Sequence, residues 1–366
     1  MSTFVLMAGG TGGHLFPAMA LAQELRRRGH TLHLMTDHRV GAFGHQFPAR
    51  EIHVVPSATP SGGNPLKFTA AALRILWGTA VAWRRLIKIR ADAAIGFGGY
   101  PVFPPFLAAR LAGVPGILHE QNAVMGRANR ALGRQASRIA LSFAATRYAE
   151  PFAAKTVLTG NPVRDRVRAV ADTPYPELGD DTPIRLVVFG GSQGARAFAD
   201  LVPPAIAELP DALRHRLRIV QQCRPEDLDR VAKAYRLAKV NVELQPFFTN
   251  LPERMAASHL VIARAGASTV AELTVLGRPA ILVPLPGSID GDQKSNAQVV
   301  DAAGGGWIVE QATISPLSLA TRLTSLFGDP ALLRAAAAAA GSLGQPRAVE
   351  QLADLAEGLV ARRNTL

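Results

Sequence analysis

The stretch Phe4-Val5-Leu6-Met7-Ala8-Gly9-Gly10-Thr11-Gly12-Gly13-His14 joins a short apolar run to a glycine-rich loop. In the second half of the chain, Leu186-Val187-Val188-Phe189-Gly190-Gly191-Ser192-Gln193-Gly194-Ala195 repeats this order. A helical pattern follows each loop. Such apolar runs are typical of strands buried on both faces of a parallel sheet, and glycine allows the tight turn into the next helix. The repeat therefore predicts two Rossmann-like domains of similar size.

Further short apolar runs alternate with helical patterns, at residues 32–35, 93–95, 116–118, 218–220, 260–263 and 280–283. This alternation predicts an α/β fold with parallel sheets covered on both faces. A length of 366 residues suits two domains, and a hydrophobic content of 48% is enough for two cores. Residues 160–183 contain four prolines and are expected to form the linker. The alanine run 335–340 and residues 347–360 predict helices near the C-terminus.

The chain is basic, with 40 Lys and Arg against 28 Asp and Glu and a formal net charge of +12. Such a charge favours polyanionic partners: nucleic acid, anionic lipid or phosphorylated small molecules.

The one cysteine, Cys223, cannot form an internal disulfide and is expected to be a small buried side chain. The first seven residues lack a basic lead and a signal-peptide core, and no apolar run reaches the ~20 residues of a membrane span. These features favour a cytoplasmic protein.

Four glycine-containing loops, at residues 9–14, 96–100, 190–195 and 264–269, follow predicted strands. Backbone N–H groups in such a loop, together with the positive end of the next helix, can bind a phosphate group. One loop is weak evidence, because a tight strand-to-helix turn needs glycine anyway. Four loops at the carboxyl ends of parallel strands, where ligands of these sheets bind, favour a phosphorylated ligand.

Three shorter patterns point to other functions. Residues 190–194 have the G-x-S-x-G spacing of a hydrolase nucleophile elbow, but neither later histidine lies in an evident catalytic loop. The first loop has Leu15 where a dinucleotide-binding fingerprint has its third glycine, although Asp37 follows the second strand as a ribose-binding acid would. Residues 290–292 read Asp-Gly-Asp, a common pattern that can hold a metal. We prefer a diphosphate site without a metal.

Seven segments together resemble the MurG family of N-acetylglucosaminyltransferases, in the family's order and spacing. They are 9–14 (Gly-Gly-Thr-Gly-Gly-His), 96–101 (Gly-Phe-Gly-Gly-Tyr-Pro), 119–122 (His-Glu-Gln-Asn), 160–164 (Gly-Asn-Pro-Val-Arg), 190–195 (Gly-Gly-Ser-Gln-Gly-Ala), 264–272 (Arg-Ala-Gly-Ala-Ser-Thr-Val-Ala-Glu) and 292–297 (Asp-Gln-Lys-Ser-Asn-Ala). No single segment is diagnostic, but the set is highly specific.

The resemblance implies a GT-B fold, in which two Rossmann-like domains face each other across a cleft. It implies an N-terminal acceptor- and membrane-binding domain at 1–163, a UDP-N-acetylglucosamine-binding domain at 164–345, and a last helix at 346–366 that packs back on the first domain. The implied reaction moves N-acetylglucosamine, without a cofactor, to the C4 hydroxyl of an undecaprenyl-pyrophosphoryl-muramyl pentapeptide (lipid I), giving lipid II for peptidoglycan synthesis. The resemblance also implies a peripheral protein that binds the anionic surface of the cell membrane on its cytoplasmic face. It implies no nucleic-acid partner.

By resemblance, the family's donor contacts fall on Thr11, Gly12, Gly13, Asn122, Arg164, Ser192, Phe248, Gly266, Ala267, Ser268, Thr269, Val270, Ala271, Glu272 and Gln293. Either Phe247 or Phe248 would hold uracil through its backbone. Ala265 stands where relatives often have serine. A carboxylate at Glu272 can accept both ribose hydroxyls, and a solvated helix-surface glutamate is the alternative. The charge of Arg164 and the hydroxyl of Ser192 suit the diphosphate. The side-chain amides of Asn122 and Gln293 suit the sugar.

Glycosyl transfer to a hydroxyl needs a base, stabilisation of an oxocarbenium-like centre and neutralisation of the leaving diphosphate. Among the loop residues, His14 alone titrates near neutral pH, which makes it the candidate base. The alternative is that His14 caps the helix or binds the donor phosphate. Direct in-line attack would invert the anomeric centre. His119 and Glu120 are either core or supporting groups. The diphosphate of the acceptor is expected at Gly98, Gly99 and Tyr100.

Residues 66–90 form the most apolar stretch. On a helix of ~100° per residue, the basic residues Lys67, Arg74, Arg85 and Lys88 fall on one side. Such a helix can lie in a lipid interface, with ~1 kcal/mol from each basic residue at an anionic surface. An ordinary buried helix is the alternative, and residues 78–79 (Gly-Thr) are potential breaks. The residues expected at the membrane are Leu73, Leu76, Trp77, Trp83, Arg85 and Lys88.

Two other functions fit parts of the pattern. An enzyme of the UDP-N-acetylglucosamine 2-epimerase type would bind the same donor without a lipid surface. A non-catalytic basic module that binds membrane or nucleic acid would explain the charge. However, the aromatic content of 6% and the scattered arginines give no stacking platform or nucleic-acid motif. Incubation with the donor alone tests the first alternative, and parallel titration with UDP and an oligonucleotide tests the second.

Overall fold

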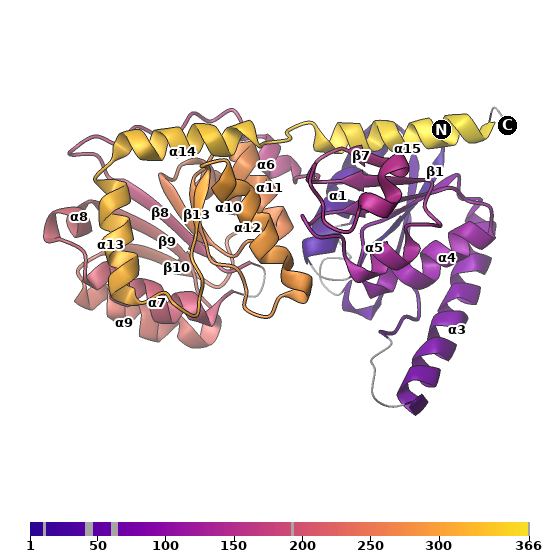
Figure 1. Cartoon of the computed structure of the whole chain (residues 1–366), viewed down its shortest axis with the longest axis horizontal. Coiled ribbons are helices and arrows are strands. Elements are labelled where there is room, and N and C mark those ends of the chain that lie inside the picture. Colours follow the sequence, from indigo (N-terminus) through magenta and orange to yellow (C-terminus); the bar gives the residue numbers. More distant parts are fainter. Residues whose placement is uncertain (10–11, 41–46, 60–64, 192–193, 365–366) are drawn as a thin grey trace. The chain divides into compact units, whose positions relative to one another are not determined.

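The computed structural model describes residues 1–9, 12–40, 47–59, 65–191 and 194–364. The chain forms two compact units: the first comprises Met1–Arg164 with Arg347–Leu366, and the second Asp165–Pro346 (Figure 1). Each unit contains its own parallel sheet, so the predicted α/β class with two Rossmann-like domains is confirmed. Within the described ranges, no helix combines the length and the apolar character that crossing a bilayer requires.

The first unit has a seven-stranded parallel sheet in the order β3-β2-β1-β4-β5-β6-β7. The order reverses between β1 and β4, and the loops after β1, β4 and β5 therefore start at adjacent strand ends. In register, Leu6 pairs with Leu34 on one side and with Ile95 on the other. The strands are β1 (Thr3–Met7), β2 (Thr31–Thr36), β3 (Glu51–Val54), β4 (Ala93–Gly96), β5 (Gly116–Glu120), β6 (Arg138–Leu141) and β7 (Thr156–Leu158).

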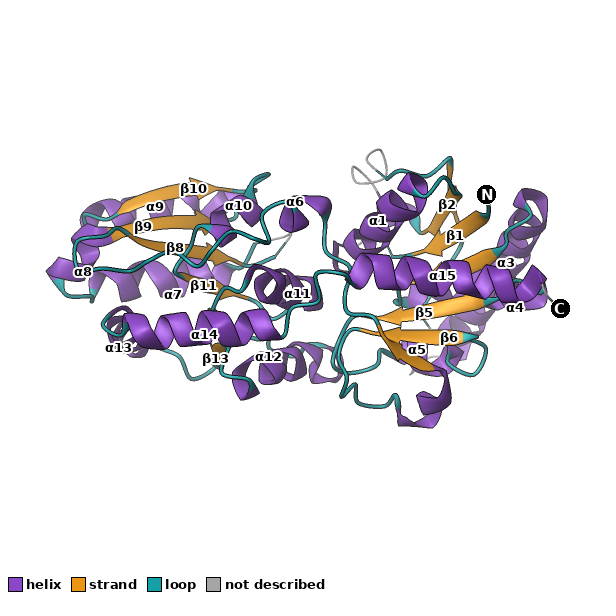
Figure 2. Cartoon of the chain, turned by 90° about the horizontal axis from the view of Figure 1, so that it is seen from above, coloured by secondary structure: helices purple, strands orange, loops and turns teal. Residues whose placement is uncertain are grey.

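Helices cover both faces of this sheet. Phe4 and Leu6 pack in one core with α1 and with the last helix, α15, which lies along this unit in Figure 2. Val5 and Met7 pack in a second core with α3, α4 and α5. Both sets of β1 side chains are apolar because both faces are covered. The helices are α1 (Gly12–Arg27), η1 (His38–Val40), α3 (Pro65–Ile89), η2 (Tyr100–Val102), α4 (Phe103–Leu111), α5 (Arg127–Leu132), η3 (Glu150–Lys155) and α15 (Ala348–Asn364).

Helix α3 runs unbroken through Gly78 and Thr79, where the sequence suggested a potential break. A Cβ atom at position 78 would overlap the carbonyl oxygen of Pro56, so this close approach of helix and loop requires glycine. The Thr79 hydroxyl donates to the Ile75 carbonyl, 2.9 Å away. Tertiary packing therefore outweighs the low helix propensity of these two residues.

The second unit has a six-stranded parallel sheet in the Rossmann order, β10-β9-β8-β11-β12-β13. Its order reverses between β8 and β11, the strands that precede two of the glycine loops. The strands are β8 (Ile184–Phe189), β9 (Leu217–Gln222), β10 (Asn241–Gln245), β11 (Leu260–Ala263), β12 (Ala280–Leu282) and β13 (Gly306–Ile308). The helices are α6 (Asp165–Arg168), α7 (Arg196–Ala207), α8 (Asp211–Arg216), η4 (Pro225–Asp227), α9 (Leu228–Leu237), α10 (Leu251–Ala256), α11 (Ala267–Leu276), η5 (Ile289–Gly291), α12 (Asp292–Ala302), α13 (Pro316–Phe327) and α14 (Pro330–Ser342).

The segment 160–183 is largely irregular, as its prolines predict, but the short helix α6 interrupts it. Its later part is held to the second unit by Arg278, whose guanidinium donates to the carbonyls of Thr173 and Pro174 at 2.9 and 3.0 Å. The helices predicted at 335–340 and 347–360 are confirmed as α14 and α15. Cys223 is buried, as expected.

Candidate active site

Helix α1 begins at Gly12, within the first glycine loop. A Cβ atom at Gly12 would lie 3.1 Å from the ring of Phe16, whereas Gly13 is exposed with open space beside it. The guanidinium carbon of Arg164 lies 5.0 Å from the centre of the same Phe16 ring. Two expected donor contacts, Gly12 and Arg164, are therefore neighbours. Thr11 lies outside the described residues.

The His14 side chain, in the first turn of α1, is bonded to the segment that follows β5. Its Nδ1 atom lies 3.1 Å from Oε1 of Gln121, 107 residues away in sequence. The amide nitrogen of Gln121 lies 2.9 Å from Nδ1 of His119 and also donates to the His119 carbonyl at 3.0 Å. Nε2 of His119 lies 3.0 Å from the carbonyl oxygen of Gly160. Gln121 lies in the 119–122 segment, but no role could be assigned to it from the sequence alone.

His119 is fully buried, and burial lowers its pKa to about 4. The hydrogen bond to Gly160 opposes this shift, and the neighbouring His14 adds to it. His119 is therefore neutral at neutral pH. Of the two roles left open for it, the contacts favour a supporting group that holds Gln121.

Gly98 and Gly99 bring the loop after β4 against the imidazole of His14. Their φ angles are 79° and 77°, a region that favours glycine. A Cβ atom at Gly99 would lie 3.3 Å from both Cδ2 and Nε2 of His14. The adjacent Tyr100 donates its hydroxyl to Asp37 at 3.3 Å, and Arg39 bonds the same carboxylate at 2.7 Å. Asp37, considered above as a ribose-binding acid, thus supports this loop.

Glu120 is buried at the end of β5 and organises the segment that carries Asn122. One carboxylate oxygen accepts from the backbone N–H of Asn122 at 3.0 Å, and the other accepts from the backbone N–H of Gly126 and the amide of Asn129, both at 2.8 Å. Burial raises the pKa of Glu120, and these hydrogen bonds oppose the shift. Glu120 therefore acts on the shape of the loop rather than as a solvated charge.

In the second unit, the loop after β11 leads into α11. Gly266 is the residue before the helix, so the N–H groups of the first turn have no acceptor within the helix. The amide of Asn296 donates to the carbonyl of Ala265 at 3.1 Å and fixes the loop. The Ser268 hydroxyl is buried without a hydrogen-bond partner among the described atoms. This helix end has the features of a phosphate site.

Other expected donor contacts of the second unit differ in exposure. Glu272 on α11 is buried, which argues against the alternative of a solvated surface glutamate. Phe248 is 5% exposed and Phe247 is 50% exposed. Gln293 accepts a hydrogen bond from the backbone N–H of Leu285 at 2.9 Å, at the start of α12. Ser192 lies outside the described residues.

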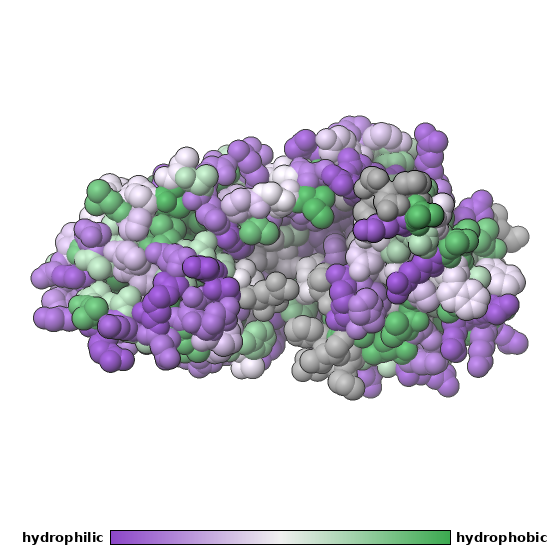
Figure 3. All heavy atoms as spheres, turned by 90° about the horizontal axis from the view of Figure 1, so that it is seen from below, coloured by the Kyte–Doolittle hydropathy of each residue, from purple (hydrophilic) through white to green (hydrophobic). Residues whose placement is uncertain are grey.

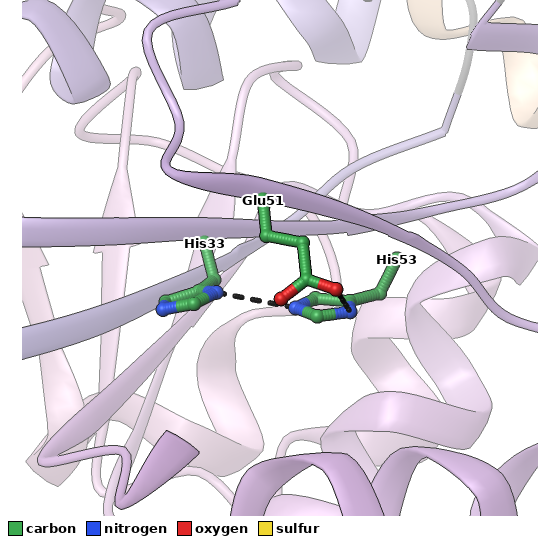
Figure 4. A group of neighbouring side chains, drawn as sticks. All are labelled: His33, Glu51 and His53. Carbon is green, nitrogen blue, oxygen red and sulfur yellow. Dashed lines mark hydrogen bonds and ion pairs between the residues drawn. The ribbon is translucent and has the colours of Figure 1, made fainter. Parts of the chain in front are cut away.

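Within the described ranges, one group of three side chains has the composition of a metal site: His33, Glu51 and His53. Figure 4 shows the two rings meeting nitrogen to nitrogen, with the carboxylate beside them. Nδ1 of His33 lies 3.1 Å from Nε2 of His53, and the ring planes differ by 16°. Such a head-on contact is a hydrogen bond, because one nitrogen donates into the lone pair of the other. The group therefore links β2 to β3.

Comparisons with known proteins agree along nearly the whole chain. Residues 4–141 match the Glycosyltransferase family 28 N-terminal domain, and residues 185–356 match the Glycosyltransferase family 28 C-terminal domain. Two relatives are each named UDP-N-acetylglucosamine--N-acetylmuramyl-(pentapeptide) pyrophosphoryl-undecaprenol N-acetylglucosamine transferase. The protein from Methylobacterium radiotolerans is 52% identical over 98% of both chains, and that from Methylobacterium nodulans is 54% identical over 96% of this chain and 95% of its own. The crystal structure of Acinetobacter baumannii MurG is 30% identical with a TM-score of 0.80, covering 98% of this chain and 100% of its own.

Proposed function

The chain belongs to glycosyltransferase family 28 and to its lipid II-forming N-acetylglucosaminyltransferases, and from this premise we propose how its residues divide the reaction. It transfers N-acetylglucosamine from UDP-N-acetylglucosamine to lipid I, the undecaprenyl-linked muramyl pentapeptide, and forms lipid II. Its two substrates are therefore a nucleotide sugar and a lipid-linked sugar, and its place is in peptidoglycan synthesis.

We propose that His14 is the base that takes the proton of the attacking hydroxyl. The single observation that carries this role is the position of its Nε2 atom beside the loop after β4, where a Cβ atom at Gly99 would lie only 3.3 Å from Nε2. We assign the acceptor's diphosphate to the loop of Gly98, Gly99 and Tyr100. This loop follows β4 and His14 follows β1, so the base and the acceptor would lie at the ends of neighbouring strands. The C4 hydroxyl of the muramyl sugar attacks the anomeric carbon as the bond to UDP breaks, which inverts that centre.

The leaving UDP is assigned mainly to the second unit. Residues 266–271, which comprise the residue before α11 and the start of the helix, offer backbone N–H groups and the positive helix end to the diphosphate. Glu272 would accept the ribose hydroxyls, and the backbone at Phe248 would hold uracil. The remaining assigned contacts are Thr11, Gly12, Gly13, Arg164 and Ser192 for the diphosphate, and Asn122 and Gln293 for the sugar.

Helix α3 is proposed as the contact with an anionic membrane surface. It buries one stripe, which includes Ala71, Ala82 and Leu86, and leaves large apolar side chains on other sides exposed. Figure 1 shows its N-terminal end extending away from the sheet of its unit, and Figure 3 shows hydrophobic and hydrophilic side chains intermixed on the face seen from below. The exposed apolar residues include the four expected at the membrane, Leu73 (67%), Leu76 (66%), Trp77 (59%) and Trp83 (41%), and also Leu66, Phe68 and Ile87.

Arg85 and Lys88 are exposed on the same helix. A helix with apolar and basic exposed residues suits the interface of an anionic bilayer, where a lipid-anchored acceptor is found. We therefore propose peripheral binding at the cytoplasmic face of the cell membrane, and that the charge of +12 serves this surface and phosphorylated substrates rather than nucleic acid.

The test is incubation of the protein with radiolabelled UDP-N-acetylglucosamine, with and without lipid I. The expected result is label in the lipid fraction only when lipid I is present. Isomerisation of the sugar nucleotide in the absence of acceptor would instead show an epimerase. Binding of an oligonucleotide without any binding of UDP would favour a nucleic-acid module.

A further inference from the structure

The side chains between β5 and α1 form an ordered series of hydrogen bonds that includes His14. Each bond has a donor and an acceptor, and the series starts at a backbone carbonyl, which can only accept. The position of each hydrogen in the series can therefore be assigned in turn, starting from this carbonyl.

The carbonyl of Gly160 lies 3.0 Å from Nε2 of His119, so that nitrogen carries the hydrogen. A neutral His119 then has its lone pair on Nδ1, which accepts from the amide nitrogen of Gln121 at 2.9 Å. The pKa of His119 of about 4 agrees with the neutral form. The Gln121 amide nitrogen also donates to the His119 carbonyl at 3.0 Å, and a flipped amide would set its oxygen against that carbonyl.

With its amide fixed in this way, Gln121 turns Oε1 towards His14. Amide oxygen accepts and does not donate, so Nδ1 of His14, 3.1 Å away, carries the hydrogen. A neutral imidazole has one hydrogen only, and the lone pair is then on Nε2. Nε2 is the nitrogen that a Cβ atom at Gly99 would approach to 3.3 Å.

We propose that Gln121 is a positioning residue that holds neutral His14 in the Nδ1–H tautomer, so that Nε2 is the atom that accepts the proton of the substrate hydroxyl. This proposal deepens the function proposed above and rests on His14 as the base. Gln121 and His119 are both buried, at 2% and 0% exposure, so water does not compete for these bonds. Because the amide is neutral, it sets the tautomer without placing a charge beside the imidazole.

The tautomer is tested on the intact protein by long-range ¹H–¹⁵N NMR of ¹⁵N-histidine-labelled enzyme at neutral pH. The signals of His14 are identified by their loss in His14→Ala. The expected spectrum has the protonated-nitrogen shift at Nδ1 and the lone-pair shift at Nε2. The reverse pattern, or averaged shifts of both nitrogens, would overturn the proposal.

Two variants of Gln121 separate positioning from a structural role. Gln121→Met removes the acceptor, and we expect averaged ¹⁵N shifts at His14 and a fall in kcat of roughly tenfold or more, with the KM for the donor little changed. Gln121→Glu retains an acceptor oxygen for His14 but loses both donor bonds to His119, so we expect it to retain the Nδ1–H pattern with a kcat below that of wild type and above that of Gln121→Met. An unchanged tautomer in Gln121→Met would refute the role of Gln121.

Gln351→Met on α15, at an exposed position, is the matched control and should leave both readouts unchanged. The spectra also distinguish this proposal from the base assignment. If His14→Ala kept full turnover, the base would be another group, whereas the NMR result for wild-type His14 would still decide the tautomer.

Discussion

The Nδ1 atom of His33 lies 3.1 Å from Nε2 of His53, and the two residues come from the paired strands β2 and β3. Burial is the main cause that lowers the pKa of both side chains. The exposed Glu51 opposes both shifts, whereas Arg50 adds to the shift at His33 and Arg85 to that at His53. The edge of the first sheet is therefore held by a neutral imidazole pair.

This pair predicts a loss of stability in mild acid. Because the folded pKa values lie below the unfolded value of about 6.5, the contribution is complete above that pH and is lost as the pH falls through the folded values. We expect the free energy of unfolding in urea to fall between pH 7.5 and pH 5.5, and to fall less in a His33→Gln, His53→Gln double variant. His38→Gln, at an exposed position, should behave as wild type. An equal acid loss in the double variant would contradict this account.

Replacement of the proposed base should affect turnover far more than donor binding. A positioned base contributes typically ~10²–10⁴ in rate, so His14→Ala should lower kcat by about that factor with little change in the affinity for UDP-N-acetylglucosamine. Steady-state transfer to lipid I and calorimetric titration of the donor measure the two quantities. His215→Ala, an exposed histidine on α8, is the control. Equal losses of turnover and donor affinity would assign His14 to binding.

The glycine beside the imidazole should be essential for more than its backbone conformation. Gly99→Ala brings a Cβ atom to within 3.3 Å of His14 at a φ of 77°, whereas Gly113→Ala places one in open space at a φ of 66°. Both changes carry the steric cost of a positive φ, on the order of 1–2 kcal/mol. We expect both variants to lower the melting temperature and only Gly99→Ala to lower kcat/KM, by tenfold or more. Similar activity of the two folded variants would count against the assigned acceptor loop.

The apolar side chains of α3 should determine membrane affinity. The triple variant of Leu73, Leu76 and Trp77 to serine removes at least ~1 kcal/mol of apolar transfer free energy per side chain. We expect at least a tenfold weaker partition into vesicles with anionic lipid, measured by co-sedimentation. Serine at Leu237 and Leu317, two exposed leucines of the second unit, is the control. Unchanged partition in the triple variant would place the membrane contact elsewhere.

Basic residues of the same helix should give the binding its dependence on salt. Charge reversal at Arg85 and Lys88 should weaken binding to anionic vesicles by ~1 kcal/mol for each charge removed and should flatten the response to ionic strength. Neutral vesicles, on which the variant should match wild type, provide the comparison. A variant with the salt response of wild type would exclude these two residues from the contact.

Much of the fold could be predicted because central strands and their loops have strong local patterns. The eight apolar runs recognised in the sequence all form strands. Among the residues that the structure describes, five further strands were not predicted: β3, β6, β7, β10 and β13. Most of these are short or contain partly exposed residues, such as Glu51 in β3 and Asn241 in β10, and they therefore lack a continuous apolar run. Gly78 suggested a break in a helix that is in fact continuous. The close approach to Pro56 that requires glycine there cannot be recognised from the sequence.

The sequence by itself determined the two strand–loop–helix repeats, the glycine loops and the histidine that ends the first of them, since each depends on neighbouring residues. Only the tertiary structure decided that Gln121 and Gly99 meet that histidine. The strand order β1-β4-β5 brings three loop starts together, although they are far apart in the chain. The partners of an imidazole, and therefore the nitrogen that carries its proton, depend on this order and on burial, which no local pattern of residues specifies.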